Sequence, residues 1–466
     1  MTKRRFKSNT DWNTLLQKHR GPVFTQLILD CIKRERDGES VQDILNSLPV
    51  IQTTTMRDTR GTYAVFGRDL IDSATFDQMN IVSRLPVYIT GALMPDAHVG
   101  YAMPIGGVAL LDMAVAPYFV GVDIGCRVSA IPFTLTRGST FENARSTLEK
   151  AAIAISAFGL RTLDEYHDIM RHDSWMEYDI LRRNKDRAQA QLGTSGGGNH
   201  FIDLARSSQT DSNGNAVYYL LMHSGSRGTG AKAGKYYDEL ASDWCAENHI
   251  NVPKHYGYFP AISDEGREYL AVHNALVKWS LANHEVIATR FFKTVGGLVN
   301  TDITIPGMTI SWLHRRVRGI PLSLWSTPHN FVEWYQDFNA SGYLHRKGAS
   351  PALPLSHTII PGSSAGYTYI VEGKGNVLSL YSTSHGAGRS KSRSAMKKQQ
   401  DTKELERIKK HVEDFGVHLY GVAIDEQWAA YKDPDTVILA QSNLLEVHDR
   451  LIPFCVIMGG ESDDGD

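Results

Sequence analysis

Four glycine-rich clusters that also carry histidine or serine constrain this 466-residue chain more than any other feature of its sequence. The chain contains 40 glycines. The clusters are residues 193–200 (GTSGGGNH), 223–230 (HSGSRGTG), 361–366 (PGSSAG) and 385–389 (HGAGR). Because glycine permits backbone angles and close approaches that a Cβ forbids, such loops can direct several N–H groups at one anion. Each loop alone could be a simple tight turn. Four of them beside histidine or serine favour a phosphate-rich ligand.

Composition and charge exclude several classes of protein. An apolar share of 42% with 9% aromatic residues is far from that of a disordered chain. Four scattered cysteines are too few for a disulfide scaffold. The N-terminal MTKRRFKSNTDW has no apolar stretch behind its basic residues, and prolines, glycines and an aspartate interrupt the best membrane candidate, residues 101–122. We therefore expect a cytoplasmic, core-forming protein without a membrane segment.

Hydrophobic periodicity predicts a mixture of helices and strands. The helical pattern is clearest over residues 141–158, 264–295 and 402–415. Short β-type runs occupy residues 217–222, 358–360, 368–371 and 377–381. Helices and strands alternate without a βαβ rhythm, so the fold class expected is α+β. No repeat or linker marks a domain boundary, and the number of domains stays open at this point. The sequence ends in an acidic tail from about residue 460.

Five side chains that bind transition metals stand beside or close to glycine. Asp123 and Cys126 lie three residues apart in VGVDIGC, His200 follows GGGN, His223 ends the apolar run VYYLLM, and His329 lies in TPHNF. Thiolate, imidazole and carboxylate together suit Mn²⁺, Zn²⁺, Fe²⁺ or Co²⁺ better than Mg²⁺ or Ca²⁺. Each residue alone is more often a buried cysteine or a hydrogen-bonded histidine. Spacing along the sequence does not show whether they converge.

His385 is the most suggestive single residue, because its small neighbours leave the imidazole open to a bulky reactant. Arg389, Lys391 and Arg393 follow it and offer charge for phosphates. This setting suits a histidine that accepts a phosphoryl group. Residues 389–410 hold nine basic side chains against three acidic ones, and Arg315, Arg316 and Arg318 form a second cluster. Both could be solvated faces, but RNA or another polyanion is a credible partner.

Two short motif matches lack the context they need. Residues 193–197 (GTSGG) fit the G-x-S-x-G nucleophile elbow, yet Gln191 and Leu192 make a poor strand before them and the chain continues after them as a β-type run instead of a helix. Gly234 and Lys235 end like a P-loop, but the first glycine and the final Ser or Thr are missing.

In combination, these residues resemble the RtcB family of RNA-splicing ligases. The segments on which the resemblance rests are, in chain order, LMPDAHVGYAMPIGG (93–107), VGVDIGC (120–126), LGTSGGGNHF (192–201), MHSGSRGTG (222–230), PHNFV (328–332), IPGSSAG (360–366) and SHGAGRSKSR (384–393). The resemblance implies a site for two Mn²⁺ ions bridged by Cys126. Asp123 and His200 would complete the coordination of one ion, and His223 and His329 that of the other. The resemblance also implies one large α+β domain over residues 1–466, with mixed sheets and flanking helices around a central metal and nucleotide cleft.

The resemblance also implies a reaction. His385 would attack the α-phosphate of GTP to give a covalent His–GMP, and Asp96 matches a residue required for activity. GMP would pass to an RNA 3′-phosphate, itself opened where necessary from a 2′,3′-cyclic phosphate, and a 5′-hydroxyl would then seal the strand. The implied nucleotide contacts are Asn199, His200, Phe201, Asp203, His329, Asn330, Pro361, Gly362, Ser363, Ser364, Thr368, His385, Gly386, Ala387 and Gly388.

Departures from the family pattern gather around the nucleotide. Ser364, Thr368 and Asp203 stand where the family usually has Met, Ser and Glu. Met458 replaces a Lys that approaches the nucleotide, and Arg127 replaces a Gly after the bridging cysteine. Loss of a cationic donor would weaken nucleotide binding by about 1.5–3 kcal/mol.

The leading hypothesis is a GTP- and Mn²⁺-dependent ligase for RNA repair or tRNA splicing. An activating protein partner is a further possibility. A metal-dependent phosphoesterase that opens cyclic phosphate ends without joining them is the alternative. A third is a protein that binds RNA ends and has lost catalysis, against which the intact metal and histidine set argues.

Overall fold

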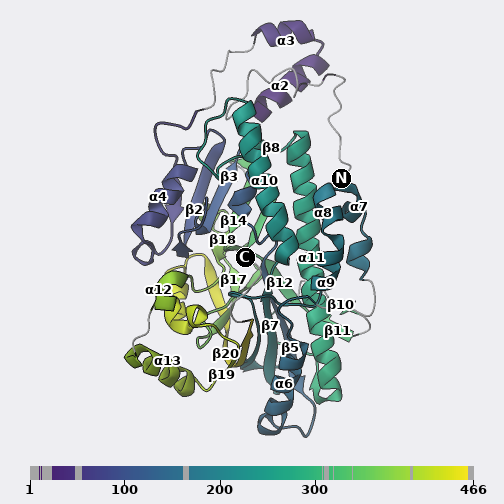
Figure 1. Cartoon of the computed structure of the whole chain (residues 1–466), viewed down its shortest axis with the longest axis vertical. Coiled ribbons are helices and arrows are strands. Elements are labelled where there is room, and N and C mark those ends of the chain that lie inside the picture. Colours follow the sequence, from purple (N-terminus) through teal and green to yellow (C-terminus); the bar gives the residue numbers. More distant parts are fainter. Residues whose placement is uncertain are drawn as a thin grey trace.

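The computed structural model describes residues 10, 12, 24–47, 55–160, 167–306, 308, 314–317, 320–337, 340–398 and 402–459. Two large β-sheets form its centre, and helices cover them (Figure 1). The expected α+β class is confirmed. The N-terminal MTKRRFKSN segment, Arg318 and the acidic tail at 460–466 lie outside the described residues, as do the side chains of Arg315 and Arg316.

The smaller sheet has five strands in the order β1-β2-β3-β14-β13. These strands are β1 (Tyr63–Val65), β2 (Tyr88–His98), β3 (Ile105–Leu111), β14 (Ser341–Lys347) and β13 (Asn330–Gln336). Residues of β2 and β3, such as Leu93 and Leu111, are fully buried in the largest core cluster, together with Trp279 of helix α11. This packing fixes the end of β2, where Asp96 lies.

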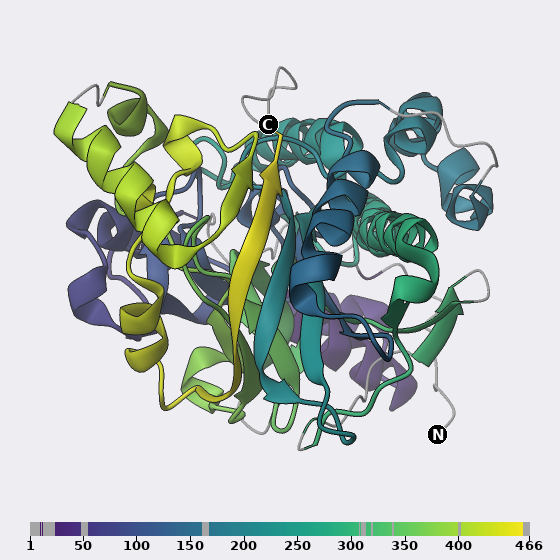
Figure 2. The same ribbon diagram turned by 90° about the horizontal axis from the view of Figure 1, so that it is seen from below.

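The larger sheet has nine strands, with the central order β12-β5-β7-β6-β20-β17-β16. These are β12 (Trp325–Pro328), β5 (Arg127–Leu135), β7 (Ala216–Ser224), β6 (Phe201–Thr210), β20 (Leu445–Met458), β17 (Thr368–Gly373) and β16 (His357–Ile360), with β19 (His418–Tyr420) beside β20 and β9 (Val299–Asn300) beside β5. Figure 2 shows α6 on one side of this sheet and α13 on the other. Small two-stranded sheets pair β4 (Ala114–Val115) with β8 (Phe259–Pro260), β10 (His314–Val317) with β11 (Ile320–Ser323), and β15 (Ala349–Pro351) with β18 (Ser382–Ser384).

The helices are α2 (Phe24–Arg36), α3 (Val41–Ser47), α4 (Ser73–Val82), α5 (Pro117–Val120), α6 (Phe141–Ile155), α7 (Ser174–Glu177), α8 (Asp179–Arg183), α9 (Lys185–Gln191), α10 (Arg227–Glu247), α11 (Asp264–Val295), α12 (Arg393–Lys398), α13 (Thr402–Phe415) and α14 (Pro434–Leu439). Helices α10 and α11 run along one flank of the molecule (Figure 1). Among the described residues, no helix combines the length and the apolar character that a membrane crossing requires.

Helix α10 lies against the loop that carries Asp123 because two of its residues lack a side chain. A Cβ on Gly234 would lie 2.9 Å from Cα of Val122. A Cβ on Gly230 would lie 3.5 Å from the backbone oxygen of Val122 and 1.7 Å from Oγ of Ser226, the residue before the helix. Only glycine permits such approaches. The glycines of residues 228–234 therefore belong to a helix that supports the site. The expectation of a glycine loop over residues 223–230 was wrong, since β7 continues to Ser224 and α10 begins at Arg227.

The predicted helices over 264–295 and 402–415 are confirmed with the same bounds, and the helix predicted over 141–158 ends at Ile155. The strands predicted within β7, β16 and β17 are also confirmed. The strand predicted over 377–381 was wrong. There the chain forms a short 3₁₀ helix, Val377–Ser379, and both Leu380 and Tyr381 have positive φ angles, which extended backbone excludes.

Candidate metal and nucleotide site

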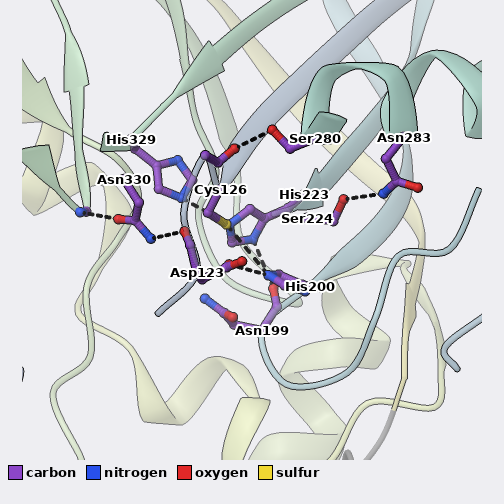
Figure 3. Close-up of polar contacts among 12 residues, drawn as sticks. Asp123, Cys126, Asn199, His200, His223, Ser224, Ser280, Asn283, His329 and Asn330 are labelled. Atoms are coloured by element: carbon purple, nitrogen blue, oxygen red, sulfur yellow. Dashed lines mark hydrogen bonds and ion pairs between the residues drawn. The ribbon is translucent and has the colours of Figure 1, made fainter. Parts of the chain in front are cut away.

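The five proposed metal ligands converge at one end of the larger sheet. Cys126 precedes β5, His200 precedes β6, His223 is the penultimate residue of β7, and His329 follows β12. The strands β12, β5, β7 and β6 are neighbours and pair antiparallel, so the start of β5 and β6 and the end of β7 and β12 lie at the same edge. Asp123 joins them from the turn before Cys126 (Figure 3).

The donor atoms are close enough to share cations. Sγ of Cys126 lies 3.2 Å from Nε2 of His223 and 3.6 Å from Nε2 of His200. Nε2 of His200 is 3.0 Å from Oδ2 of Asp123, and Nε2 of His223 is 3.3 Å from Nε2 of His329. The atoms form two triplets, Asp123–Cys126–His200 and Cys126–His223–His329, each within 4.8 Å, and Cys126 belongs to both.

The protonation of His223 fits a metal ligand. Its Nδ1 lies 3.0 Å from the backbone oxygen of Asn199, so Nδ1 carries the hydrogen and Nε2 keeps its lone pair. Burial lowers the pKa of His223 to about 3, which keeps the ring neutral. That one lone pair faces both Sγ of Cys126 and Nε2 of His329. A cation among these atoms would satisfy all three, so the donor set fits a soft or borderline divalent ion.

The neighbouring acid and thiol are also tuned by burial. Burial raises the pKa of the Cys126 thiol, so the thiolate needs a bound cation to displace its proton. Burial acts to raise the pKa of Asp123 too, but the charge of His200 and hydrogen bonds from His200 and Cys126 outweigh it and lower that pKa to about 2. Asp123 is therefore a carboxylate at neutral pH.

Asn330 and Gly225 hold the ligand loop in place. The Asn330 amide donates to the backbone oxygen of Asp123 at 3.2 Å and accepts from the N–H of Gly348 at 2.7 Å. A Cβ on Gly225 would lie 1.9 Å from Oδ1 of Asp123. The sequence predicted Asn330 as a nucleotide contact. In the structure its side-chain amide also makes hydrogen bonds that hold the loop of Asp123, which the sequence did not reveal.

Helix α11 supports the site from behind, which sequence reasoning missed. Arg127 turns its guanidinium toward this helix and donates to Oγ of Ser280 and to the backbone oxygen of Val277. Burial lowers the pKa of Arg127 to about 10. Asn283 binds the backbone N–H groups of Gly193 and Thr194 through Oδ1. Polar residues on the buried face of a helix with otherwise apolar anchors were the signal that could have found them.

His385 lies beside the metal ligands and is held by Asp96. Its ring centroid is 4.8 Å from that of His329. Its Nδ1 is 2.7 Å from Oδ2 of Asp96, which also accepts the backbone N–H of His385 at 3.1 Å. Asp96 is fully buried, and although burial acts to raise its pKa, the hydrogen bond from His385 and nearby charges lower it. Lys432 fixes this segment by donating to the backbone oxygens of Pro95 and Ala97.

The glycine clusters meet around these side chains. A Cβ on Gly386 would lie 3.4 Å from the backbone oxygen of Pro361, so clusters 361–366 and 385–389 are in contact. Gly388, with φ of +72°, lies so close to Asp96 that a Cβ would be 2.2 Å from its backbone oxygen. Oγ of Ser364 is buried without a hydrogen-bond partner in the described part of the chain. The remaining predicted contacts in these loops, Gly362, Ser363 and Ala387, lie in the same clusters.

Asp203, Phe201 and Met458 lie on one face of the larger sheet. Phe201 is paired directly with Met458, and Asp203 with Val456, so the four side chains share that face. Met458 is 5% exposed, and Thr368 at the start of β17 is also buried. Burial raises the pKa of Asp203 well above its usual value, against a hydrogen bond from the backbone of Ile457.

The basic residues after His385 have partners that the sequence did not reveal. Arg389 donates to Oε2 of Glu426 at 3.2 Å and to the backbone oxygen of Asp425 at 2.7 Å. Arg393 also pairs with both acids, and their side chains are almost fully buried. These two guanidinium groups thus anchor the loop that follows His385 to residues 425 and 426.

Comparison with known proteins gives one consistent result. The family model described as tRNA-splicing ligase RtcB matches residues 78–156 and 139–459. The RNA-splicing ligase RtcB of Escherichia coli (strain K12) is 31% identical over 373 residues, which cover 76% of this chain and 86% of that protein. The tRNA-splicing ligases RtcB of Nanoarchaeum equitans and Archaeoglobus fulgidus are 27% and 24% identical, over 83% and 85% of this chain and 92% of each relative. The matched residues include all the side chains described above.

Proposed function

Since the chain belongs to the RtcB family of RNA-splicing ligases, we propose that it is an RNA ligase that uses GTP and Mn²⁺. It joins a 3′-phosphate end, or a 2′,3′-cyclic phosphate end once opened, to a 5′-hydroxyl end, in RNA repair or tRNA splicing. The single observation that carries this proposal is the position of His385, held by the buried Asp96 and 4.8 Å, ring to ring, from His329.

The geometry of His385 supports its role as the nucleophile. Oδ2 of Asp96 accepts the Nδ1 hydrogen, and because the two ring nitrogens lie on opposite sides of the imidazole, Nε2 keeps its lone pair for reaction. Nε2 would attack the α-phosphate of GTP, forming an N–P bond as the bond to the pyrophosphate oxygen breaks. The Asp96 carboxylate would stabilise the positive charge that develops on the ring.

Two further displacements would complete the reaction. An oxygen of the RNA 3′-phosphate would attack the phosphorus of the histidine adduct, which frees His385 and places GMP on the RNA end. The 5′-hydroxyl would then attack that 3′-phosphate, lose its proton and expel GMP. Two Mn²⁺ ions held by Asp123, Cys126 and His200 and by Cys126, His223 and His329 would neutralise phosphate charge when bound.

Nucleotide transfer to the protein tests the proposal. The chain is incubated with [α-³²P]GTP and Mn²⁺ and separated under denaturing conditions, with ATP in parallel. Wild type and the control His418→Ala, a largely exposed histidine, are expected to carry the label, while His385→Ala is not. Equal labelling of His385→Ala would contradict the proposal. Stronger labelling with ATP than with GTP would show that the pocket at Asp203 and Met458 prefers adenine to guanine.

Met458 favours a second candidate function. An uncharged side chain occupies the position where the family usually has the lysine that approaches the nucleotide. With weak nucleotide binding, the metal cluster alone would act as a phosphoesterase that opens cyclic phosphate ends. RNA with a 2′,3′-cyclic phosphate and a 5′-hydroxyl distinguishes the two, since the ligase yields a joined strand and the phosphoesterase only an opened end.

We further propose that the chain acts as one ligase domain in the cytoplasm. The site draws Asp96 from the smaller sheet and His223 from the larger one, which supports a single unit. All four cysteines are free, as suits a reducing compartment. An activating protein partner would assist repeated rounds of ligation, which is tested by whether the purified protein alone completes more than one round.

A further inference from the structure

Three metal-capable side chains meet on the larger sheet outside the ligase site. His357 begins β16, Glu372 lies opposite it on β17, and His448 lies on β20, the next strand. The pairing of β17 with β20 shifts between Ile370 and Val371, which leaves His448 as the extra residue of a β-bulge. A bulge re-aims a side chain, and here it brings the His448 imidazole beside Glu372.

The donor atoms of the three groups all lie within 4.8 Å of one another, close enough to bind one ion. Oε2 of Glu372 lies 3.4 Å from Nε2 of His448 and 3.7 Å from Nε2 of His357. Ligands at about 2.0–2.1 Å from a tetrahedral zinc ion lie roughly 3.3 Å from one another. Charge-assisted hydrogen bonds would be shorter, about 2.7–2.9 Å. The two histidines therefore surround the carboxylate without bonding to it directly.

His357 supplies an independent sign of a missing ligand. Its side chain is 4% exposed, yet neither ring nitrogen has a hydrogen-bond partner in the described part of the chain. Burial, with the nearby charge of His448, lowers the pKa of His357, so its ring is neutral and offers a lone pair. An imidazole buried without partners is costly unless something binds it. The Trp325 ring stacks over it with an interplanar angle of 17° and closes that side.

We propose that His357, Glu372 and His448 bind one zinc ion, separate from the two-metal site of the proposed ligase. Two imidazoles and one carboxylate are a ligand set that Zn²⁺ accepts, with a fourth position left for water. Glu372 and His448 are about one-fifth exposed, so the ion has a route from solvent. No thiol contributes, which makes this site chemically distinct from the one that contains Cys126.

The position of the site indicates what the ion does. It joins β16, β17 and β20 at the open end of the hairpin whose turn is the 361–366 cluster. Zinc would tie the base of this hairpin to β20 and so hold the strands that carry the predicted nucleotide loop.

The test is the zinc content of the full chain after loading with Zn²⁺ and removal of the excess. His357→Ala and His448→Ala are expected to hold one zinc ion fewer per chain than wild type. His418→Ala is expected to lose none, because this histidine also pairs with a carboxylate but belongs to none of the metal-capable groups among the described residues. Glu372→Gln repeats the test with a side chain of the same shape, in case the alanine variants fold poorly.

Cobalt distinguishes this site from the ligase metals. Co²⁺ bound at Cys126 gives a thiolate charge-transfer band in the near ultraviolet, whereas a site of two histidines and a glutamate gives only visible bands. Glu372→Gln should lose one equivalent of visible absorbance and keep the near-ultraviolet band. Equal metal content in wild type and in all three cluster variants would overturn the proposal, whether or not the protein joins RNA.

Discussion

Gly225→Ala tests the architecture of the proposed metal site without replacing any of the five ligands. A Cβ built on Gly225 lies 1.9 Å from Oδ1 and 2.5 Å from Cγ of Asp123. Real Cβ atoms do not approach closer than 3.0 Å, so the Asp123 carboxylate must move by about 1 Å or more. Its contact with Nε2 of His200, now 3.0 Å, cannot survive that shift unchanged. One of the two metal triplets then loses its carboxylate.

We expect Gly225→Ala to bind Mn²⁺ about 10–100-fold more weakly, a loss of about 1.4–2.7 kcal/mol, since misplacing groups that orient a ligand has this effect. Isothermal titration of Mn²⁺ into metal-free protein measures it. Gly297→Ala is the matched control, because a Cβ there meets nothing within 4 Å. Mn²⁺ affinity equal to that of wild type in Gly225→Ala would refute the placement of Asp123.

Three further predictions concern the reaction and the nucleotide pocket. Asp96→Asn keeps the shape of the side chain but loses the negative charge beside His385. The rate of nucleotide transfer to the protein, measured in a radiolabel time course, should therefore fall at least about 100-fold. An unchanged rate would show that Asp96 has no part in the transfer. Met458→Lys restores a cation diagonal to Asp203 and should tighten GTP binding by about tenfold or more in a fluorescence titration, with ATP as the comparison. Burial raises the pKa of Asp203 in the folded chain, so above the unfolded pKa of 3.8 the unfolded chain loses this proton first. The free energy of unfolding therefore falls as the pH rises from 3.8 toward the folded pKa. Asp203→Asn should therefore gain stability relative to wild type more at pH 8 than at pH 5 in urea unfolding, and a difference independent of pH would contradict this.

Local signals in the sequence were sufficient for some elements. Helix α11 has the bounds predicted because Ser263 caps its first turn by accepting from the N–H of Gly266 and Gly296 follows its last residue. The strand predicted over 377–381 failed because apolar and aromatic residues can also pack around turns. Leu380 and Tyr381 adopt positive φ angles there, a choice that the tertiary structure makes.

The chemical groups of the site were visible in the sequence, whereas their arrangement was not. Cys126 and Asp123 are near neighbours, but their meeting with His329 depends on the pairing of β12 with β5. The same is true of the acids that pair with Arg389 and Arg393, which come from residues 425 and 426. The His357 site has ligands 15 and 76 residues apart, and only strand pairing and a bulge reveal it.

The proposed ligation requires His385 to carry the nucleotide. Intact-protein mass measurement after incubation with GTP and Mn²⁺, followed by peptide mapping at neutral pH to preserve an acid-labile N–P bond, tests it directly. We expect the added mass of one guanylate, located on His385 and absent from His385→Ala. An unmodified chain, or a guanylate on a different residue, would contradict it.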